Sequence, residues 1–222
     1  ENNARYIKEG DKVLDVGCAN GFAAFRQADM KKINITGIDY AENMIKYALE
    51  KHREFSSPEN IIFKQGDVRK LDFADNEFDL TYTTRVLINL PNWEEQKTGI
   101  EECYRVTKKG GTVILSEAFW EPLVLLNSMR TLVKLPPLVE HDFNRYIKFS
   151  RVEEFLKTKG YTYEIIDYTS VYYLGSRFLR ELITDASKYP GYSNPVNEIF
   201  YNIEKEYSGG GFGIQQAIVI KK

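Results

Sequence analysis

Short apolar runs alternate with amphipathic stretches over the first 120 residues of the chain. The runs are rich in valine and isoleucine, as strands buried on both faces of a parallel sheet are, and the stretches between them show helical spacing. We predict strands at residues 12–16, 33–38, 60–65, 78–83 and 112–117, and helices at 22–31, 42–55 and 93–106. The Lys-Lys-Gly-Gly run at 108–111 is expected to end the third helix. This alternation predicts an α/β fold built on a doubly wound parallel sheet.

The alternation loosens after residue 120. We predict helices at 121–133 and 152–159, strands at 161–173 and 212–220, and two further helices within an interlude at 175–211. Pro136 and Pro137 break the first of these helices, and a Tyr-Pro-Gly-Tyr run at 189–192 separates the last two. No repeat, low-complexity tract or linker divides the chain. We therefore predict a single domain, residues 1–222, with elaborations at about 120–150 and 175–211.

The composition is that of a soluble globular protein, with 43% hydrophobic and 28% charged residues. The net charge of −2 provides no overall attraction to nucleic acid or to an anionic membrane. No run approaches the roughly 18 apolar residues that a membrane helix needs. Cys18 and Cys103 cannot form a disulfide framework and fit a reducing compartment. We therefore predict a cytoplasmic protein with no nucleic-acid or membrane partner, whose oligomeric state stays open.

The run VLDVGCANGF at residues 13–22 carries the clearest chemical signal. A buried strand is followed by an acid and small residues at alternate positions, namely Asp15, Gly17, Ala19 and Gly21. Glycines let the chain turn sharply and bring its backbone close to a ligand. The N–H groups of such a turn, at the N-terminus of the following helix, point into the crevice where anionic groups bind. The run therefore predicts a nucleotide-binding turn.

An acidic residue lies at or just beyond the end of each of the first three predicted strands: Asp15, Asp39 and Asp67. The Asp39 carboxylate is placed where it can accept two hydrogen bonds from a ribose, and Asp67 with Val68 can hold an adenine amino group and ring face. Alternatively, such acids cap the following helices, as Asp39 could for the helix that begins at Glu42. Together with the glycine turn, the three acids favour a nucleotide site at the carboxyl ends of the strands.

From Val13 to Leu115 the chain resembles the class I S-adenosylmethionine-dependent methyltransferases. VLDVGCANG resembles the family's first motif, GIDYAENMI its second and QGDVRKLDF its adenine-contact motif. FDLTYTTRVLINL resembles the fourth strand and its exit, and RVTKKGGTVIL the fifth strand. The resemblance implies a Rossmann-like, mostly parallel seven-stranded sheet with an antiparallel final strand. It also implies S-adenosylmethionine as the cofactor and methyl transfer as the reaction.

The resemblance further implies which side chains bind the cofactor. They are Asp15, Gly17, Cys18, Ala19, Asp39, Tyr40, Met44, Asp67, Val68, Thr83 and Arg85. The turn would hold the methionine portion, Asp39 the ribose and Asp67 the adenine, with Arg85 near the sulfonium end. Ala19 departs from the family, which often has a third glycine here. A methyl group is a small change, so binding should survive unless this residue needs a positive φ.

A nicotinamide-dependent dehydrogenase is the alternative interpretation of the turn. Its fingerprint is G-x-G-x-x-G followed by an acid about 20 residues later. Here the spacing is Gly17-x-Ala19-x-Gly21, which lacks the final glycine at the required offset. Asp39 fits both interpretations, but Asp67 followed by Val68 favours S-adenosylmethionine.

The methyl acceptor should be bound by the segments after the fourth and fifth strands and by the elaborations. Glu117 and His141 are candidate general bases; the alternatives are a structural carboxylate and a surface histidine. The predicted substrate-binding residues are Asn127, Arg130, Asn144 and Tyr146. The first two share a helix face at i, i+3 and suit a hydroxyl, phosphate or carboxylate. Alternatively, that face is solvated and Arg130 pairs with a nearby acid.

The stretch from Arg85 to Tyr146 also resembles a bacterial group of small-molecule methyltransferases that includes sugar-modifying enzymes. The Asn/Asp-Pro-Pro-Tyr/Phe motif of enzymes that methylate nucleic-acid bases is not found at Thr83, and Glu94-Glu95 lies too late for a protein arginine methyltransferase. We find no clustered acids for a catechol-type metal site and expect no metal. These patterns favour O-methylation of a small polar acceptor such as a saccharide. N-methylation of an amine and a non-catalytic cofactor-binding module are the alternatives.

Overall fold

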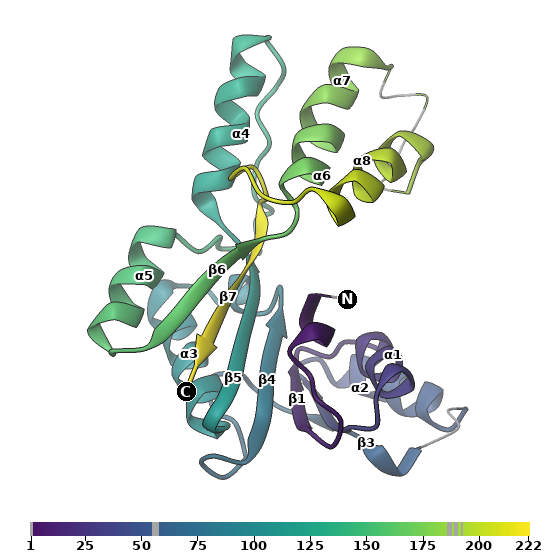
Figure 1. Cartoon of the computed structure of the whole chain (residues 1–222), viewed down its shortest axis with the longest axis vertical. Coiled ribbons are helices and arrows are strands. Elements are labelled where there is room, and N and C mark those ends of the chain that lie inside the picture. Colours follow the sequence, from purple (N-terminus) through teal and green to yellow (C-terminus); the bar gives the residue numbers. More distant parts are fainter. Residues whose placement is uncertain (1, 55–57, 186–187, 189–190, 192) are drawn as a thin grey trace.

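The computed structural model describes residues 2–54, 58–185, 188, 191 and 193–222. Its core is a seven-stranded sheet with strand order β3-β2-β1-β4-β5-β7-β6 (Figure 1). The strands are β1 (Lys12–Val16), β2 (Asn34–Asp39), β3 (Ile61–Gln65), β4 (Phe78–Thr84), β5 (Thr107–Ala118), β6 (Thr162–Asp167) and β7 (Gln215–Lys221). Only β7 runs antiparallel to its neighbours among these strands. The predicted Rossmann-like, mostly parallel sheet with an antiparallel final strand is confirmed.

Helices cover both faces of the sheet because successive strand residues point to opposite sides. Val13 packs with α1 and α2 in one hydrophobic cluster, and Leu14 packs with α3 and α5 in the other. The α-helices are α1 (Phe22–Met30), α2 (Glu42–His52), α3 (Trp93–Val106), α4 (Trp120–Leu132), α5 (Phe149–Thr158), α6 (Ser170–Leu174), α7 (Arg180–Ile183) and α8 (Pro195–Glu206). Short helices lie at η1 (Asn2–Arg5), η2 (Pro58–Asn60), η3 (Leu87–Asn89) and η4 (Gly175–Leu179), the last a π-helix that joins α6 to α7.

The prediction of one long strand at 161–173 is wrong beyond Asp167, where β6 ends. The Asp167 carboxylate accepts hydrogen bonds from the Ser170 hydroxyl and from the backbone N–H groups of Thr169 and Gly211, at 3.3 and 2.9 Å for the two N–H groups. These bonds turn the chain, and α6 begins at Ser170. The aromatic residues that suggested a strand therefore lie on a helix, because local side-chain bonding prevails over β-propensity.

The Lys-Lys-Gly-Gly run at 108–111 also differs from its prediction. Helix α3 ends at Val106, and the run forms the first part of β5, which begins at Thr107. Thr107 pairs with Phe78, and the register shifts between Phe78 and Leu80. Such a bulge accommodates extra residues in one strand without ending the ladder. The strand is therefore longer at its start than the apolar run alone predicts.

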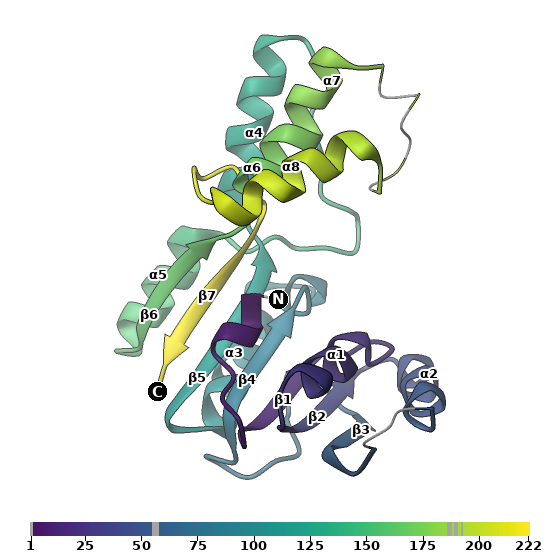
Figure 2. The same ribbon diagram turned by 45° about the vertical axis from the view of Figure 1, so that its right-hand side comes forward.

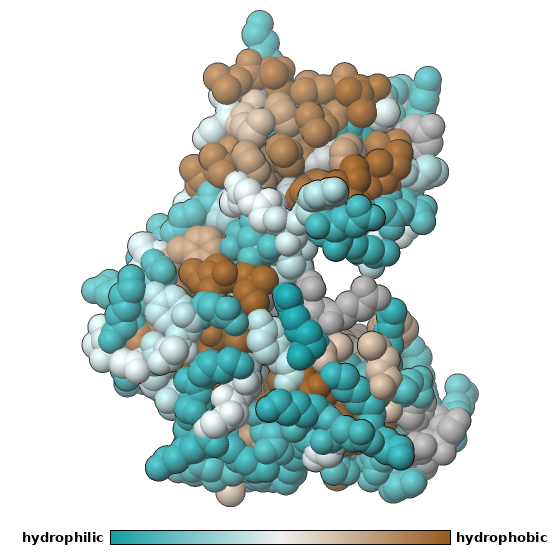
Figure 3. Space-filling model, viewed as in Figure 1, coloured by the Kyte–Doolittle hydropathy of each residue, from teal (hydrophilic) through white to brown (hydrophobic). Residues whose placement is uncertain are grey.

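Helices α4, α6, α7 and α8 with η4 form a helical lobe beyond the carboxyl ends of β4 and β5 (Figures 1 and 2). Two of these helices, α7 and α8, fall within the predicted interlude, whereas most of the predicted break at 189–192 lies outside the described residues. Apolar side chains gather on the outer face of the lobe (Figure 3). Exposed apolar residues on α4 and α7 and next to them include Val124, Leu125, Leu132, Leu182 and Ile183. No helix in the described part of the chain is both long enough and apolar enough to cross a membrane.

Candidate functional site

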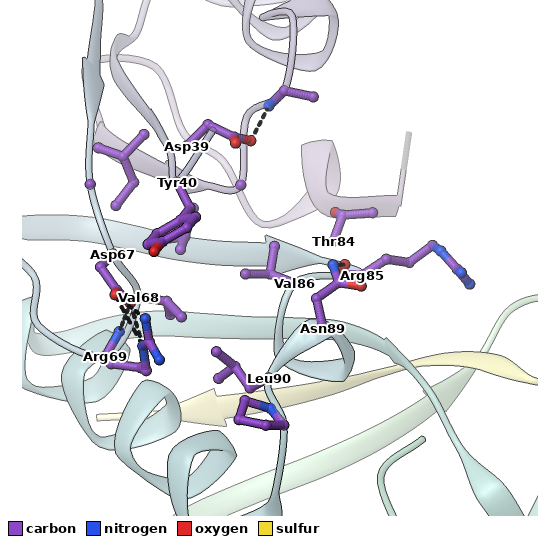
Figure 4. A pocket seen from close by; sticks show the side chains of 16 residues that line it. Asp39, Tyr40, Asp67, Val68, Arg69, Thr84, Arg85, Val86, Asn89 and Leu90 are labelled. Carbon is purple, nitrogen blue, oxygen red and sulfur yellow. Dashed lines mark hydrogen bonds and ion pairs between the residues drawn. The ribbon is translucent and has the colours of Figure 1, made fainter. Parts of the chain in front are cut away.

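A cavity of about 430 Å³ opens at the carboxyl ends of β1, β2 and β4 (Figure 4). This volume lies in the range of small-molecule and cofactor sites. Seven of the side chains predicted to bind a cofactor line it: Gly17, Ala19, Asp39, Tyr40, Asp67, Val68 and Arg85. Asp15, Cys18, Met44 and Thr83 are not among the lining residues. The sheet topology thus brings most of the predicted set together at one edge.

The turn after β1 depends on left-handed backbone at Gly17, Ala19 and Gly21. Gly17 has a φ of 79°, and a Cβ there would lie 2.2 Å from Cγ2 of Val86, so no side chain fits. Ala19 has a φ of 48°, which is the condition under which its departure from glycine matters. A left-handed alanine costs about 1 kcal/mol relative to glycine. The turn therefore keeps the shape that a third glycine would give it, with some strain.

Asp39 holds this turn from the neighbouring strand. Its Oδ2 accepts a hydrogen bond of 2.9 Å from the N–H of Ala19, and its Oδ1 accepts one of 2.9 Å from the N–H of Ala41. The second bond fixes the turn that leads into α2, whose N-cap is Ala41, so Asp39 does not itself cap that helix. Asp39 also lines the cavity (Figure 4). The two roles coexist, because a carboxylate has lone pairs for more than two bonds.

Asp67 is held by a side chain that sequence reasoning missed. Arg69 donates from Nε to Asp67 Oδ1 at 2.9 Å and from Nη1 to Glu95 Oε2 at 2.6 Å. The guanidinium of Arg69 lies 5.9 Å from the centroid of the Tyr40 ring and lines the cavity. Its hydrogen bonds hold the pKa of Asp67 below the ordinary value. The signal was available in QGDVRK, where a cation follows the acid at i+2.

Asp15 and Cys18 are buried in the turn region behind the cavity wall. Asp15 lies opposite Tyr82 across the β1–β4 pairing. The pKa of Asp15 is raised to about 7, chiefly by burial; the Tyr82 hydroxyl opposes this rise, and the nearby charge of Asp39 contributes to it. Burial likewise raises the pKa of the Cys18 thiol well above its usual value, so this thiol is not activated for nucleophilic chemistry.

The exit of β4 places Thr84, rather than Thr83, on the cavity. Neighbouring residues of a strand face opposite sides, so an error of one position reverses the direction of a side chain. Thr83 is buried and donates its hydroxyl to Glu117 Oε1 at 2.7 Å. Thr83 thus belongs to the support of the site and not to its lining.

Glu117 is fully buried and binds the loop that follows β4. Its carboxylate accepts hydrogen bonds from the Thr83 hydroxyl and from the N–H groups of Val86, Leu87 and Ile88, at 2.7, 3.1, 3.2 and 3.3 Å. Burial raises the pKa of Glu117, and these hydrogen bonds oppose the rise. The geometry favours the structural alternative: this carboxylate orders the N-terminus of η3 and does not line the cavity.

Asn127 and Arg130 are engaged within the lobe. The Asn127 amide binds both backbone groups of Leu138 at 2.8 Å. Arg130 is buried, pairs with Glu181 at 2.9 Å and donates to the carbonyls of Pro136 and Arg177. The anticipated acid partner is present, although Arg130 is itself buried and only Glu181 is partly exposed. The geometry therefore favours roles in holding the lobe together over direct substrate binding.

The remaining predicted residues lie on the segment between α4 and α5. His141 is exposed and stacks on Phe143 with ring centroids 5.4 Å apart. Asn144 is fully buried, and neither its amide oxygen nor its amide nitrogen has a hydrogen-bond partner. Tyr146 is half-buried. The N–H of Arg145 donates to the Ile88 carbonyl at 2.6 Å, so this segment docks against η3 beside the cavity.

Residues 7–170 match a family model described as a methyltransferase domain. The 27-O-demethylrifamycin SV methyltransferase of Amycolatopsis mediterranei is 27% identical over 117 residues, which cover 52% of this chain and 42% of that protein. The demethylmenaquinone methyltransferase of Staphylococcus epidermidis is 34% identical over 128 residues, which cover 57% of this chain and 51% of that protein. The matched part thus spans about half the length of these relatives or less.

Among solved structures, that of the [4+2]-cyclase SpnF is similar, with a TM-score of 0.64 and 23% sequence identity. The alignment covers 97% of this chain and 76% of that protein. This likeness supports the fold alone. Because a protein described as a cyclase shares the architecture, the reaction must be argued from the site and not from the fold.

Proposed function

Because the chain belongs to the family of methyltransferase domains, we propose that it is a class I enzyme that transfers a methyl group from S-adenosylmethionine to a small-molecule acceptor. The observation that carries this proposal is the cavity at the strand ends. There Gly17, Asp39 and Asp67, from three separate strand exits, line one space of about 430 Å³. The nicotinamide alternative is not favoured, because it leaves Asp67 and Val68 without a role.

The residues present fit the cofactor. The left-handed turn at Gly17 brings backbone close to the cavity, where the methionine portion would lie. Asp39 would accept the ribose hydroxyls, and Asp67 with the buried Val68 would hold the adenine. When bound, S-adenosylmethionine supplies a methyl group on a positively charged sulfur. The chain's part is to bind, to orient the acceptor in line with that methyl group and to exclude water.

The acceptor side supports a small molecule more clearly than a particular one. The two relatives named above are described as acting on a demethylated rifamycin SV and on demethylmenaquinone. A polar metabolite hydroxyl, including that of a saccharide, remains our proposed acceptor. A hydroxyl benefits from a general base, and His141 is the exposed candidate on the segment whose Arg145 binds η3.

N-methylation is the second candidate function. The observation that favours it is the position of Glu117, whose carboxylate is fully buried beneath the loop after β4. An amine that arrives deprotonated needs no general base, so its methylation would not require Glu117 to reach the acceptor. The replacement of His141 by Gln separates the two candidates. A hydroxyl acceptor should then be methylated at least tenfold more slowly at neutral pH, whereas an amine acceptor should be methylated at an unchanged rate.

Calorimetric titration with S-adenosylmethionine and S-adenosylhomocysteine tests the cofactor assignment directly. We expect one site per chain for each compound. Failure of both to bind would contradict the proposal. A small-molecule panel with a labelled methyl donor then tests catalysis, and binding without transfer to any class of acceptor would favour the non-catalytic module.

A further inference from the structure

A second cavity, of about 330 Å³, lies beside the first residues of α3, α4 and α5. Among the described residues, it shares none of its lining with the cofactor cavity. Its volume is in the range of small-molecule sites. Trp93 and Trp120, the two tryptophans of the chain, both line it, and Trp120 is 38% exposed. The cavity therefore offers indole surface that a ligand can cover.

The charges that line this second cavity are predominantly positive. Arg145, Lys148 and Arg151 line it, and all three are exposed. Within the described residues, no carboxylate lies at ion-pair distance from any of them. Glu140 is the only carboxylate among the described lining residues, and its Oε2 accepts the N–H of Tyr146 at 3.2 Å. A concave surface with an excess of one sign of charge attracts ions of the other sign.

Arg145 is held in a conformation that suits an anion. Its Nη1 donates to the carbonyls of Asp142 and Asn144 at 2.7 and 2.6 Å, and its backbone N–H donates to the Ile88 carbonyl at 2.6 Å. In the described part of the chain, its Nε and Nη2 donate to no other residue. These two nitrogens form the edge of a guanidinium that binds a carboxylate or a phosphate through two parallel bonds. Because the side chain is already fixed, little of its conformational freedom is lost on binding.

Lys148 brings a positive charge and an aromatic ring together. Its Nζ lies 5.9 Å from the centroid of the Trp120 ring, a distance at which the ring attracts the cation. Lys97 lies 6.0 Å from the Trp93 centroid, but its charge is paired with Glu94 at 2.7 Å. Lys148, unlike Lys97, is therefore available to a ligand, and an anion that it binds lies beside an indole ring.

We propose that this second cavity binds a small ligand that carries a carboxylate or a phosphate next to a planar ring. Arg145, Lys148 and Arg151 bind the anionic group, and the ring of the ligand covers Trp120. Guanidinium groups suit both anions, and aromatic rings pack well against an indole. The site is separate from the cofactor cavity, so the inference does not depend on the proposed function.

Tryptophan fluorescence reports on this cavity, because both tryptophans line it. The full chain is titrated with phenyl phosphate, benzoate, neutral benzyl alcohol, and the ringless anions inorganic phosphate and acetate. Each titration is made at constant ionic strength, with and without saturating S-adenosylhomocysteine.

We expect phenyl phosphate or benzoate to change the indole emission saturably, and to bind about tenfold or more tightly than benzyl alcohol and than its own ringless anion. The tighter of the two identifies the class of anion. No saturable change, or equal binding of benzyl alcohol, would overturn the inference. Equal binding of the ringless anion would overturn the role of the ring, and loss of the signal with S-adenosylhomocysteine would overturn the separate location.

Variants then locate the bound ligand. Arg145→Gln and Arg151→Gln should each weaken binding of the tighter anion by about tenfold, as expected for the loss of a charge-assisted bond. Trp120→Ala should weaken it by about fivefold, with Trp93 still reporting. Arg53→Gln, an exposed arginine at the end of α2 and outside the cavity, is the matched control and should change nothing. Anion binding that survives both cavity glutamine variants, in protein that unfolds at the wild-type temperature, would overturn the assignment.

The cofactor titration separates this inference from the proposed function. Neither Arg145 nor Arg151 lines the cofactor cavity, so both glutamine variants should bind S-adenosylhomocysteine within about threefold of the wild type. If S-adenosylhomocysteine binds but the anions do not, this inference fails alone. If the anions bind through the two arginines but no adenosyl compound binds, the proposed function fails and the second site stands.

Discussion

The proposed cofactor side, at the strand ends, and the proposed acceptor side, in the helical lobe, differ in the charged groups that bind their backbone. On the cofactor side, carboxylates accept backbone N–H groups: Asp39 holds the turn at Ala19, and Glu117 holds the loop after β4. On the acceptor side, the guanidinium of Arg130 donates to backbone carbonyls and to Glu181. The lobe thus uses a buried cation in addition to carboxylates such as Asp167, which accepts the N–H groups of Thr169 and Gly211.

The difference also concerns distance along the chain. The bond between Asp39 and Ala19 closes within a single strand–helix–strand unit, across 20 residues. The pair between Arg130 and Glu181 spans 51 residues and joins α4 to α7. Substitutions that destabilise the lobe are therefore expected to leave the structure of the cofactor side unchanged. Substitutions at the strand ends should instead lower the affinity of the cofactor site.

The largest expected effect comes from the buried anion at the sheet edge. Glu117→Gln replaces an acceptor of four bonds by an amide whose NH₂ group faces backbone donors. We expect the free energy of unfolding to fall by about 3 kcal/mol, measured by urea denaturation. Glu140→Gln is the control, because its carboxylate is half-buried and binds only the N–H of Tyr146. Equal losses in the two variants would show that Glu117 has no special role.

Asp39→Ala should break the cofactor side without unfolding the protein. The variant loses two bonds to backbone N–H groups and the proposed ribose acceptor. We expect the affinity for S-adenosylhomocysteine to fall about 30- to 100-fold, or about 2–3 kcal/mol, by calorimetry. Glu42→Ala, an exposed carboxylate paired only with Lys46, serves as the control. Unchanged affinity in Asp39→Ala would refute its place at the ribose.

Arg130→Met should break the acceptor side and leave the cofactor side intact. The change removes a buried cation that binds two carbonyls and Glu181. We expect about 2 kcal/mol of lost stability together with wild-type affinity for S-adenosylhomocysteine. Lys134→Met, just beyond the end of α4, provides a control for loss of one charge. Cofactor binding that falls in parallel with stability would show that the two regions are not independent.

The raised pKa of Asp15 predicts how the stability of the folded protein depends on pH. Burial raises it from 3.8 to about 7, so between these values the folded protein holds a proton that the unfolded chain has released. Stability should therefore fall as pH rises from about 4 to about 7, with a slope of up to about 1.4 kcal/mol per pH unit.

Asp15→Asn should abolish that slope in urea unfolding at pH 5, 6 and 7. Asp29→Asn, on the exposed surface of α1, should retain the wild-type slope. If the Asp15→Asn variant shows the same pH dependence as the wild type, another group is responsible for it.

The smallest expected effect is an increase in the free energy of unfolding. Ala19→Gly removes the strain of a left-handed alanine, so we expect the protein to become more stable by about 0.5–1 kcal/mol. Ala23→Gly, inside helix α1, should instead lose about 1 kcal/mol because glycine disfavours helices. Urea denaturation of both variants checks the opposite signs. A loss of stability in Ala19→Gly would mean that its φ is not a source of strain.

Most of the residues that line the cavity could be predicted from the sequence because their signals are local. The glycine turn and the acids Asp39 and Asp67 each follow a short apolar strand, and parallel strands bring their carboxyl ends to one edge. The prediction placed Thr83 on the cavity, whereas Thr84 lines it. The end of a strand cannot be located to a single residue from the sequence, and neighbouring strand residues face opposite sides. The prediction missed Arg69, because an exposed cation near an acid is common and carries little information by itself.

The contacts of the helical lobe were harder to predict from the sequence, and the reasons are physical. Arg130 was noted as a substrate contact, but its burial depends on the packing of α4 against η4 and α7, which no local pattern encodes. Contacts made across the lobe follow from tertiary structure and not from spacing along one element.

The place of β7 in the sheet has a consequence for the order of assembly. β7 lies between β5 and β6, although β6 precedes it along the chain. During synthesis, β6 therefore emerges before the strand that bridges it to the rest of the sheet, and the whole of α6 to α8 is made in the interval. The open edges of β5 and β6 remain exposed to other chains during that time. The late insertion of one central strand, a non-local and therefore slow pairing, should set the pace of folding and the moment of greatest risk of aggregation.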